Sequence, residues 1–267
     1  MTVSGGLVRD GSPNRTGLGR FVRHIRLNAD ADTNSFPFTL PVIAWLMRSG
    51  GLDLAPGVTF LIGENGTGKS TLLEALAVAV GFNPEGGSQN FRFSTRASQS
   101  TLGNHLVLTR NGKPRTGFFL RAESYYNVAT EIERLNNDPH SGPLLPAYGG
   151  MSPHTRSHGE SFLDLVTHRF SPDGLYLLDE PEAALSVRGC MALLARLAEL
   201  AAQDCQIVVA THSPVLLALP GATIAEITDN GTIQHKDYEH ALPVRTTRDF
   251  LGAPQQFLHH LLPTHHT

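Results

Sequence analysis

Apolar positions along the chain fall into short strand-type runs and longer helix-type runs. In the second half the two kinds alternate, with only short turns between them, which favours a mostly parallel sheet covered by helices. The predicted strands are 21–27, 58–62, 175–178 and 206–210, and the predicted helices are 41–48, a helix from Thr71 to about residue 80, 128–136, 159–170 and 189–203.

Two further pairs of strands look antiparallel. Residues 105–109 and 117–121 are joined by Asn-Gly-Lys-Pro, which predicts a hairpin, and Asp-Asn-Gly between 223–228 and 232–235 predicts another. The Pro- and Gly-rich stretch 138–153 is interpreted as a loop.

Composition narrows the class of protein. The chain has 267 residues, 40% of them hydrophobic and 17% charged, which fits a folded protein with one large domain. Two cysteines are too few for a disulfide framework or a four-cysteine zinc site, so a reducing, cytoplasmic setting fits best. The longest apolar helix pattern, 191–202, is interrupted by Arg196 and Glu199, so we expect no membrane span.

A glycine-rich loop stands between the strand 58–62 and the helix that follows, and it matches the pattern G-x-x-x-x-G-K-[ST]. Backbone N–H groups of such a loop converge on phosphate oxygens at a helix N-terminus. Lys69 is expected to reach the β and γ phosphates, and the Ser70 hydroxyl to bind Mg²⁺. The predicted phosphate-binding residues are Gly63, Glu64, Asn65, Gly66, Thr67, Gly68, Lys69, Ser70 and Thr71.

Acidic and imidazole side chains follow the next two buried strands. Asp179 and Glu180 come at the end of the strand 175–178, where ligands bind in open α/β sheets. Asp179 suits Mg²⁺, and Glu180 can polarise a water. His212 follows the strand 206–210, where a neutral imidazole can hydrogen-bond the γ-phosphate or the attacking water. We therefore assign catalysis to Glu180, His212 and Lys69.

Together these motifs resemble the ABC-type P-loop ATPases over residues 58–214. The loop GENGTGKS is similar to their Walker A, LYLLDEP to their Walker B with its adjoining glutamate, and ATHSP to their switch-histidine region. Ser157-His158-Gly159-Glu160-Ser161 lies at the signature position. The resemblance implies that Ser157, Gly159 and Glu160 contact the ATP held by a partner copy, in a head-to-tail homodimer that encloses two ATP molecules.

The resemblance also implies the layout of the chain. It gives an α/β fold with a mostly parallel sheet flanked by helices, an antiparallel β subdomain and a small helical lobe at about 123–170. The predicted organisation is a flexible arm over 1–20, one ATPase domain over 21–245 and a C-terminal helical tail over 246–267. The segments GFFLRAES, SHGES and LLDEPEAALS are most similar to those of stand-alone bacterial ATPases related to the chromosome-maintenance (SMC-like) branch.

The chain departs from the usual ABC pattern at three places. His158 and Glu160 stand where the signature has a second glycine and a glutamine. Glu123 stands where the family has a glutamine, and its carboxylate can hold Mg²⁺ or its water as well as serve an ordinary surface role. Residues 183–186 replace the loop that usually carries an aspartate. Phe36 and Phe38 are the aromatic candidates for contact with adenine.

Several functions stay open. The N-K-x-D motif of a GTPase and the G-x-S-x-G motif of a serine hydrolase are both absent, and His154 and His158 are a weak metal pair. The ATPase can act in DNA maintenance, can power a membrane transporter, which is less favoured, or can be a switch that does not hydrolyse ATP. A net charge of −3 excludes a uniformly basic nucleic-acid binder. The stretch 91–121 nevertheless has basic residues among phenylalanines, which suits nucleic acid or an exposed hairpin with core phenylalanines: Arg92, Arg96, Arg110, Lys113, Arg115 and Arg121.

Overall fold

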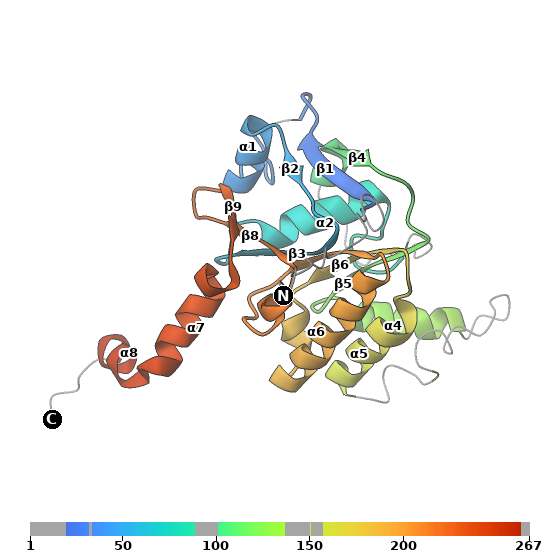
Figure 1. The fold of residues 1–267 in the computed structure, drawn as a ribbon. Helices are drawn as coiled ribbons and strands as arrows, with labels where there is room; N and C mark the ends of the chain where they lie inside the picture. Colours follow the sequence, from blue (N-terminus) through green and yellow to red (C-terminus); the bar gives the residue numbers. More distant parts are fainter. Residues whose placement is uncertain (1–19, 32–33, 89–100, 137–149, 151–156, 263–267) are drawn as a thin grey trace, which may run out of the picture.

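A six-stranded sheet divides the molecule into two layers. The computed structural model describes residues 20–31, 34–88, 101–136, 150 and 157–262. Helices α4, α5 and α6 cover one face of this sheet, and α2, α1 and a small three-stranded sheet cover the other (Figure 1). Each layer has its own hydrophobic core, so every central strand is apolar on both sides.

The large sheet has the strand order β5-β6-β7-β3-β8-β9. Its first five strands are parallel, and β9 pairs antiparallel with β8. The parallel arrangement brings the carboxyl ends of β3, β6 and β7 to one edge, where the sequence places its polar motifs. The strands are β3 (Gly57–Gly63), β5 (Thr116–Arg121), β6 (Gly174–Asp179), β7 (Gln206–Ala210), β8 (Thr223–Ile227) and β9 (Ile233–Lys236).

Helices α1, α2, α4, α5 and α6 occur where their apolar periodicity predicts them, whereas α3 was not predicted. The helix after the glycine-rich loop begins at Lys69, two residues before the predicted start, because the loop passes directly into it through Gly68. The helices are α1 (Pro41–Arg48), α2 (Lys69–Val80), α3 (Leu102–His105), α4 (Tyr125–Asn136), α5 (His158–Arg169), α6 (Val187–Ala202), α7 (Leu242–Gly252) and α8 (Pro254–Leu261). Short 3₁₀ turns are η3 (Pro181–Ala184), η4 (Leu216–Ala218) and η5 (Tyr238–His240). Among the described residues no helix is long and apolar enough to cross a bilayer.

The predicted hairpin over 105–121 is wrong. Strand β4 (Leu106–Arg110) pairs antiparallel with β1 (Val22–Leu27), whose other neighbour is the two-residue strand β2 (Leu52–Asp53). Strand β5 instead lies in the large sheet, parallel to β6. Phe118 and Phe119 explain the difference, because both rings are fully buried, one in each of the two hydrophobic cores that cover the large sheet, although β5 is its edge strand. The antiparallel subdomain is therefore β2-β1-β4, whereas the hairpin of β8 and β9 is confirmed.

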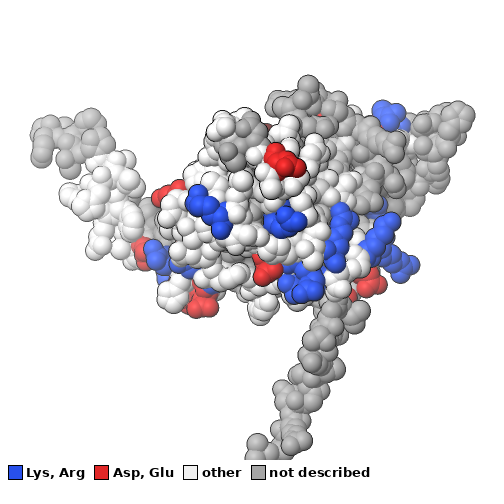
Figure 2. Space-filling model, turned by 90° about the horizontal axis from the view of Figure 1, so that it is seen from above, with Lys and Arg blue, Asp and Glu red and all other residues white. Residues whose placement is uncertain are grey.

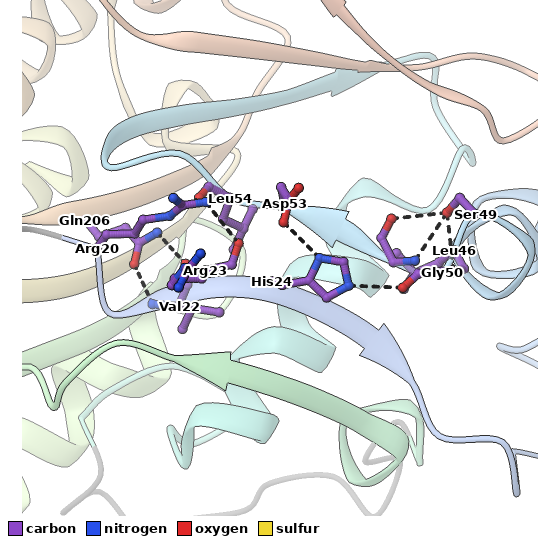
Figure 3. A network of polar contacts seen from close by, with 11 residues as sticks. Arg20, Val22, Arg23, His24, Leu46, Ser49, Gly50, Asp53, Leu54 and Gln206 are labelled. Atoms are coloured by element: carbon purple, nitrogen blue, oxygen red, sulfur yellow. Dashed lines mark hydrogen bonds and ion pairs between the residues drawn. The ribbon is translucent and has the colours of Figure 1, made fainter. Parts of the chain in front are cut away.

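A buried glutamine joins the small sheet to the large one. The Gln206 Oε1 accepts hydrogen bonds from the backbone N–H groups of Phe21 and Val22, both at 2.8 Å. Its Nε2 donates to the carbonyl oxygens of Val22 at 2.9 Å and Ala55 at 3.0 Å. Figure 3 shows Gln206 beside Val22. All four hydrogen-bonding positions of this amide are thus satisfied, so the full burial of Gln206 leaves no side-chain polar group unpaired.

Helices α7 and α8 project from the body (Figure 1). Val244, near the start of α7, is buried in the core, whereas Leu251 and Leu261 further along are 71% and 68% exposed. A helical C-terminal segment is present, and its first helix begins at Leu242. The predicted division of the chain into an arm, a domain and a tail stays a prediction, and the arm lies outside the described residues apart from Arg20.

Candidate functional site

The phosphate loop lies between the end of β3 and the start of α2. Its backbone needs left-handed dihedral angles, with φ of +147° at Gly63 and +95° at Gly68. A Cβ at Gly63 would lie 2.4 Å from the carbonyl oxygen of Ile227, and a Cβ at Gly68 would lie 2.8 Å from a methyl group of Val42. Only glycine fits both positions, so the sequence pattern has a steric cause.

Lys69 is held inside this loop. Its Nζ donates hydrogen bonds to the carbonyl oxygens of Gly63 and Glu64, both at 3.0 Å. The side chain is buried, and burial lowers the pKa of Lys69 below its ordinary value, with Glu180 and Asp179 opposing that shift. An ammonium group fixed over a loop of backbone N–H groups is suited to anionic oxygens such as those of a phosphate chain.

Asp179 ends β6 as a buried carboxyl group. Burial raises its pKa from 3.8 to about 6, although Arg121 and the hydroxyl of Ser70 act in the opposite direction. The Oδ1 atom is buried with no hydrogen-bond partner among the described groups. A buried oxygen left without a partner is the kind of atom that a bound cation or water satisfies.

Ser70, Glu123, Asp179 and Glu180 meet around a cavity of about 430 Å³. A hydroxyl and carboxylate oxygens are the hard ligands that Mg²⁺ prefers, so this donor set and the unsatisfied Oδ1 of Asp179 fit the predicted metal. The Glu123 side chain is 83% exposed, which leaves it free to turn toward or away from the cavity.

Arg121 lies in this site rather than in a basic patch, which corrects the sequence interpretation. It pairs with Asp179 in the register of β5 and β6, and its Nε lies 3.3 Å from the Asp179 carboxylate. Its Nη1 lies 2.8 Å from Glu74 on α2, and its Nη2 lies 3.7 Å from Glu123. The sequence contained a usable signal, because Arg121 ends the strand just before Ala122-Glu123, at the same sheet edge as Asp179.

Glu180 and His212 lie close together on adjoining loops. The chain leaves β6 after Asp179, and Glu180 adopts a left-handed conformation with φ of +48°, which turns its side chain out of the strand's alternation. The backbone N–H of Glu180 donates to the Ala210 carbonyl at 2.9 Å. The Glu180 Oε1 lies 3.9 Å from His212 Nε2, so the two predicted catalytic groups face each other.

The signature segment forms the N-terminus of α5. The Ser157 Oγ accepts from the backbone N–H of Glu160 at 3.3 Å, and the Ser157 N–H donates to the Glu160 carboxylate at 3.1 Å, which is a capping box. The Ser157 hydroxyl also donates to that carboxylate at 2.7 Å. A Cβ on Gly159 would lie 2.9 Å from the carbonyl oxygen of Ala184, so α5 begins against the turn η3.

Other candidates take different places. Phe38 is buried and is unavailable to adenine, whereas Phe36 is 75% exposed. Phe118 and Phe119 are core residues and cannot stack on bases. Arg92, Arg96 and His154 lie outside the described residues. Among the described part of the chain, no group of three or more His, Cys, Asp or Glu side chains forms a metal site, and both cysteines are buried.

Comparison with protein-family models gives two matches. A model described as "AAA domain" matches residues 46–139, and a model described as "AAA domain, putative AbiEii toxin, Type IV TA system" matches residues 149–218. The first match contains the phosphate loop and Glu123, and the second contains Ser157, Asp179, Glu180 and His212.

Individual proteins are similar at low identity. An uncharacterised ABC transporter ATP-binding protein of Haemophilus influenzae is 23% identical over 77% of this chain and 82% of its own length. An inward-facing ABC transporter structure is 14% identical, with a TM-score of 0.49 over 87% of this chain and 89% of its own. The SMC head domain of Thermotoga maritima is 16% identical, with a TM-score of 0.39 over 70% and 92%.

Proposed function

Since the chain carries AAA-type P-loop ATPase sequence in both halves, we propose that it binds Mg-ATP and hydrolyses it as a head-to-tail dimer. The main support for this proposal is the convergence of four side chains at one edge of the sheet. Lys69, Asp179, Glu180 and His212 come from three different stretches of the chain and converge at the carboxyl ends of β3, β6 and β7. Such convergence matches what phosphoryl transfer to water requires of a protein.

Each residue has a defined task in this reaction. Lys69 and the loop N–H groups bind the phosphate chain, and Ser70, Asp179 and Glu123 would hold Mg²⁺, which would offset negative charge on the phosphates. Glu180 accepts a hydrogen bond from the attacking water, orients it in line with the leaving oxygen and takes up its proton. His212 lies beside Glu180 and donates or accepts a hydrogen bond at the same water or at the γ-phosphate.

The exposed N-terminus of α5 supports the proposed dimer. Ser157 and Gly159 stand at an exposed helix N-terminus, whose dipole favours an anion. In the proposed dimer this terminus meets the γ-phosphate bound by the other copy, so each ATP site takes residues from both subunits.

Mixing two inactive variants tests the shared site. Lys69→Ala removes the phosphate ligand, and Ser157→Asp keeps an acceptor for the Glu160 N–H but replaces the hydroxyl donor with a second carboxylate, beside that of Glu160, against the partner's phosphate. Each variant alone is expected to lose at least about 100-fold in turnover, whereas an equal mixture recovers about a quarter of the wild-type rate, because half the dimers hold one intact site. A mixture as inactive as its components would contradict a site built from two subunits.

A second cavity suggests the partner. It has a volume of about 260 Å³ and lies at the amino ends of β5 and β6, about 17 Å along the strands from the ATP site. The cavity is lined by four basic residues from the β4–β5 connection and the end of α5, and by no described acidic residue: Arg110, Lys113, Arg115 and Arg169. Lys and Arg side chains outnumber Asp and Glu side chains on the face of the molecule seen in Figure 2. Such a surface fits the phosphate backbone of a nucleic acid.

Charge reversal tests this partner. Lys113→Glu with Arg115→Glu is expected to weaken binding of labelled double-stranded DNA at least about 10-fold and to reduce the salt slope by about 2, with basal ATP turnover unchanged. Lys236→Glu with Arg245→Glu changes the net charge equally, away from the cavity, and serves as the control. Equal weakening by both pairs would contradict a defined site, and an absence of DNA binding by the wild type would favour a membrane transporter or another protein as the partner.

A further inference from the structure

Glu182, two residues beyond the proposed base, contacts the loop that bears His212. Its Oε1 accepts a hydrogen bond from the backbone N–H of His212 at 2.5 Å. Its Oε2 is buried and has no hydrogen-bond partner among the described groups. The Glu182 side chain is half-buried, and a partly buried carboxylate that loses its hydrogen bond to a backbone N–H pays a desolvation cost without compensation.

The contact completes a double tie between two loops. The Glu180 N–H donates to the Ala210 carbonyl at 2.9 Å, and the Glu182 carboxylate accepts from His212 two residues further on in both segments. The other contacts of this loop are to β3 and within the loop: the Thr211 N–H donates to the Leu61 carbonyl at 3.1 Å, and the Ser213 N–H donates to the Thr211 hydroxyl at 3.0 Å. Glu182 is therefore the side chain that fixes this loop against the turn carrying Glu180.

The turn that carries Glu182 is also fixed from the opposite side. Gly159, at the start of α5, approaches the Ala184 carbonyl so closely that no side chain fits between them. The turn η3 consequently lies between the signature end of α5 and the His212 loop, and Glu182 is its contact to the latter.

We infer that Glu182 is a positioning residue, which holds the backbone of His212 so that its imidazole faces Glu180. This inference rests on the proposed ATP hydrolysis and adds a residue to it. Glu182 touches neither water nor phosphate in this role, and it acts through the placement of His212. Misplacing a catalytic group by about 1 Å can cost about 100-fold in rate, so a backbone tie at this point has a measurable effect.

Three variants test the inference by steady-state kinetics. Glu182→Ala is expected to lower kcat about 10- to 100-fold and to leave the KM for ATP within about threefold, because the phosphate loop is intact. Glu182→Gln keeps an acceptor oxygen and should retain kcat within about threefold. Glu226→Ala is the matched control, since that carboxylate also accepts a backbone N–H, but from Leu242 on α7 at 3.0 Å instead of from the His212 loop.

A double-mutant cycle separates positioning from other roles. If Glu182 acts through His212, adding Glu182→Ala to His212→Ala should cost no more than about threefold further. Independent, multiplying effects would overturn the inference, as would Glu182→Gln losing as much as Glu182→Ala, or an equal loss in Glu226→Ala.

Hydrogen exchange keeps the inference testable without turnover. The amide of His212 should exchange at least about 10-fold faster in Glu182→Ala than in the wild type, while the amides of α6 are unchanged. Unchanged protection of His212 would overturn the inference. A wild type that hydrolyses no ATP would overturn the proposed function instead, and the exchange result would still decide the role of Glu182.

Discussion

Replacing Glu180 with glutamine is expected to lower kcat about 10²- to 10³-fold while ATP still binds. The amide keeps the size of the side chain but cannot take the proton of the attacking water, and a general base typically contributes an acceleration of this size. Lys69 and the phosphate loop are untouched, so the KM for ATP should change little. Single-turnover phosphate release measures the loss directly.

The same variant should accumulate as an ATP-bound dimer. A dimer that opens only after hydrolysis stays closed when hydrolysis is blocked, and its mass in solution with Mg-ATP is measurable by light scattering. Glu199→Gln on α6 is the control, because its carboxylate is 61% exposed and pairs with Arg196 instead. Wild-type turnover in Glu180→Gln would remove Glu180 from the mechanism.

Replacing Asp179 with asparagine is expected to abolish Mg-dependent turnover and to stabilise the protein without nucleotide. The folded-state pKa of about 6 lies above the ordinary 3.8, so the folded protein binds the proton more tightly than the unfolded chain does. The contribution of the protonated Asp179 carboxyl group to the free energy of unfolding is fully present below about pH 4 and is lost as the pH rises through 6. Above that pH the buried charge costs about 3 kcal/mol.

The raised pKa of Asp179 predicts the direction in which Tm changes when this residue is replaced. In EDTA at pH 7.5, Asp179→Asn should raise Tm by about 5 °C or more, and the gain should shrink toward zero near pH 4. Arg121 keeps Glu74 as a partner at 2.8 Å, so the substitution does not strand its charge. Asp237→Asn, at a side chain 93% exposed, should leave Tm unchanged. A lower Tm for Asp179→Asn at every pH would refute this account of the buried carboxyl group.

Local signals predicted most of the central fold. Three strands are buried on both faces, so their segments of the sequence are continuous apolar runs: 58–62, 175–178 and 206–210. The structure has strands at all three places. The order of those strands also placed Asp179 and His212 at one sheet edge, because parallel strands share a direction. Backbone sterics fixed the phosphate loop in the same local way.

The sequence did not predict which distant strands pair with each other. Asn-Gly-Lys-Pro is a good turn, yet β4 and β5 enter different sheets because burial of Phe118 and Phe119 outweighs turn preference. Arg121 was assigned to a basic stretch by counting charges, whereas the register with Asp179 sets its place. Gln206 and Glu182 bind backbone groups, and such contacts leave no pattern in the chain.

The central claim is that this chain turns over ATP at the site formed by Lys69, Asp179, Glu180 and His212. Phosphate release by the purified protein with Mg-ATP, beside Lys69→Ala at equal concentration, tests it most directly. We expect turnover that saturates with ATP and is lost in Lys69→Ala. Saturable binding of ATP with no phosphate release by the wild type at any protein concentration would contradict it and would make the protein a nucleotide switch.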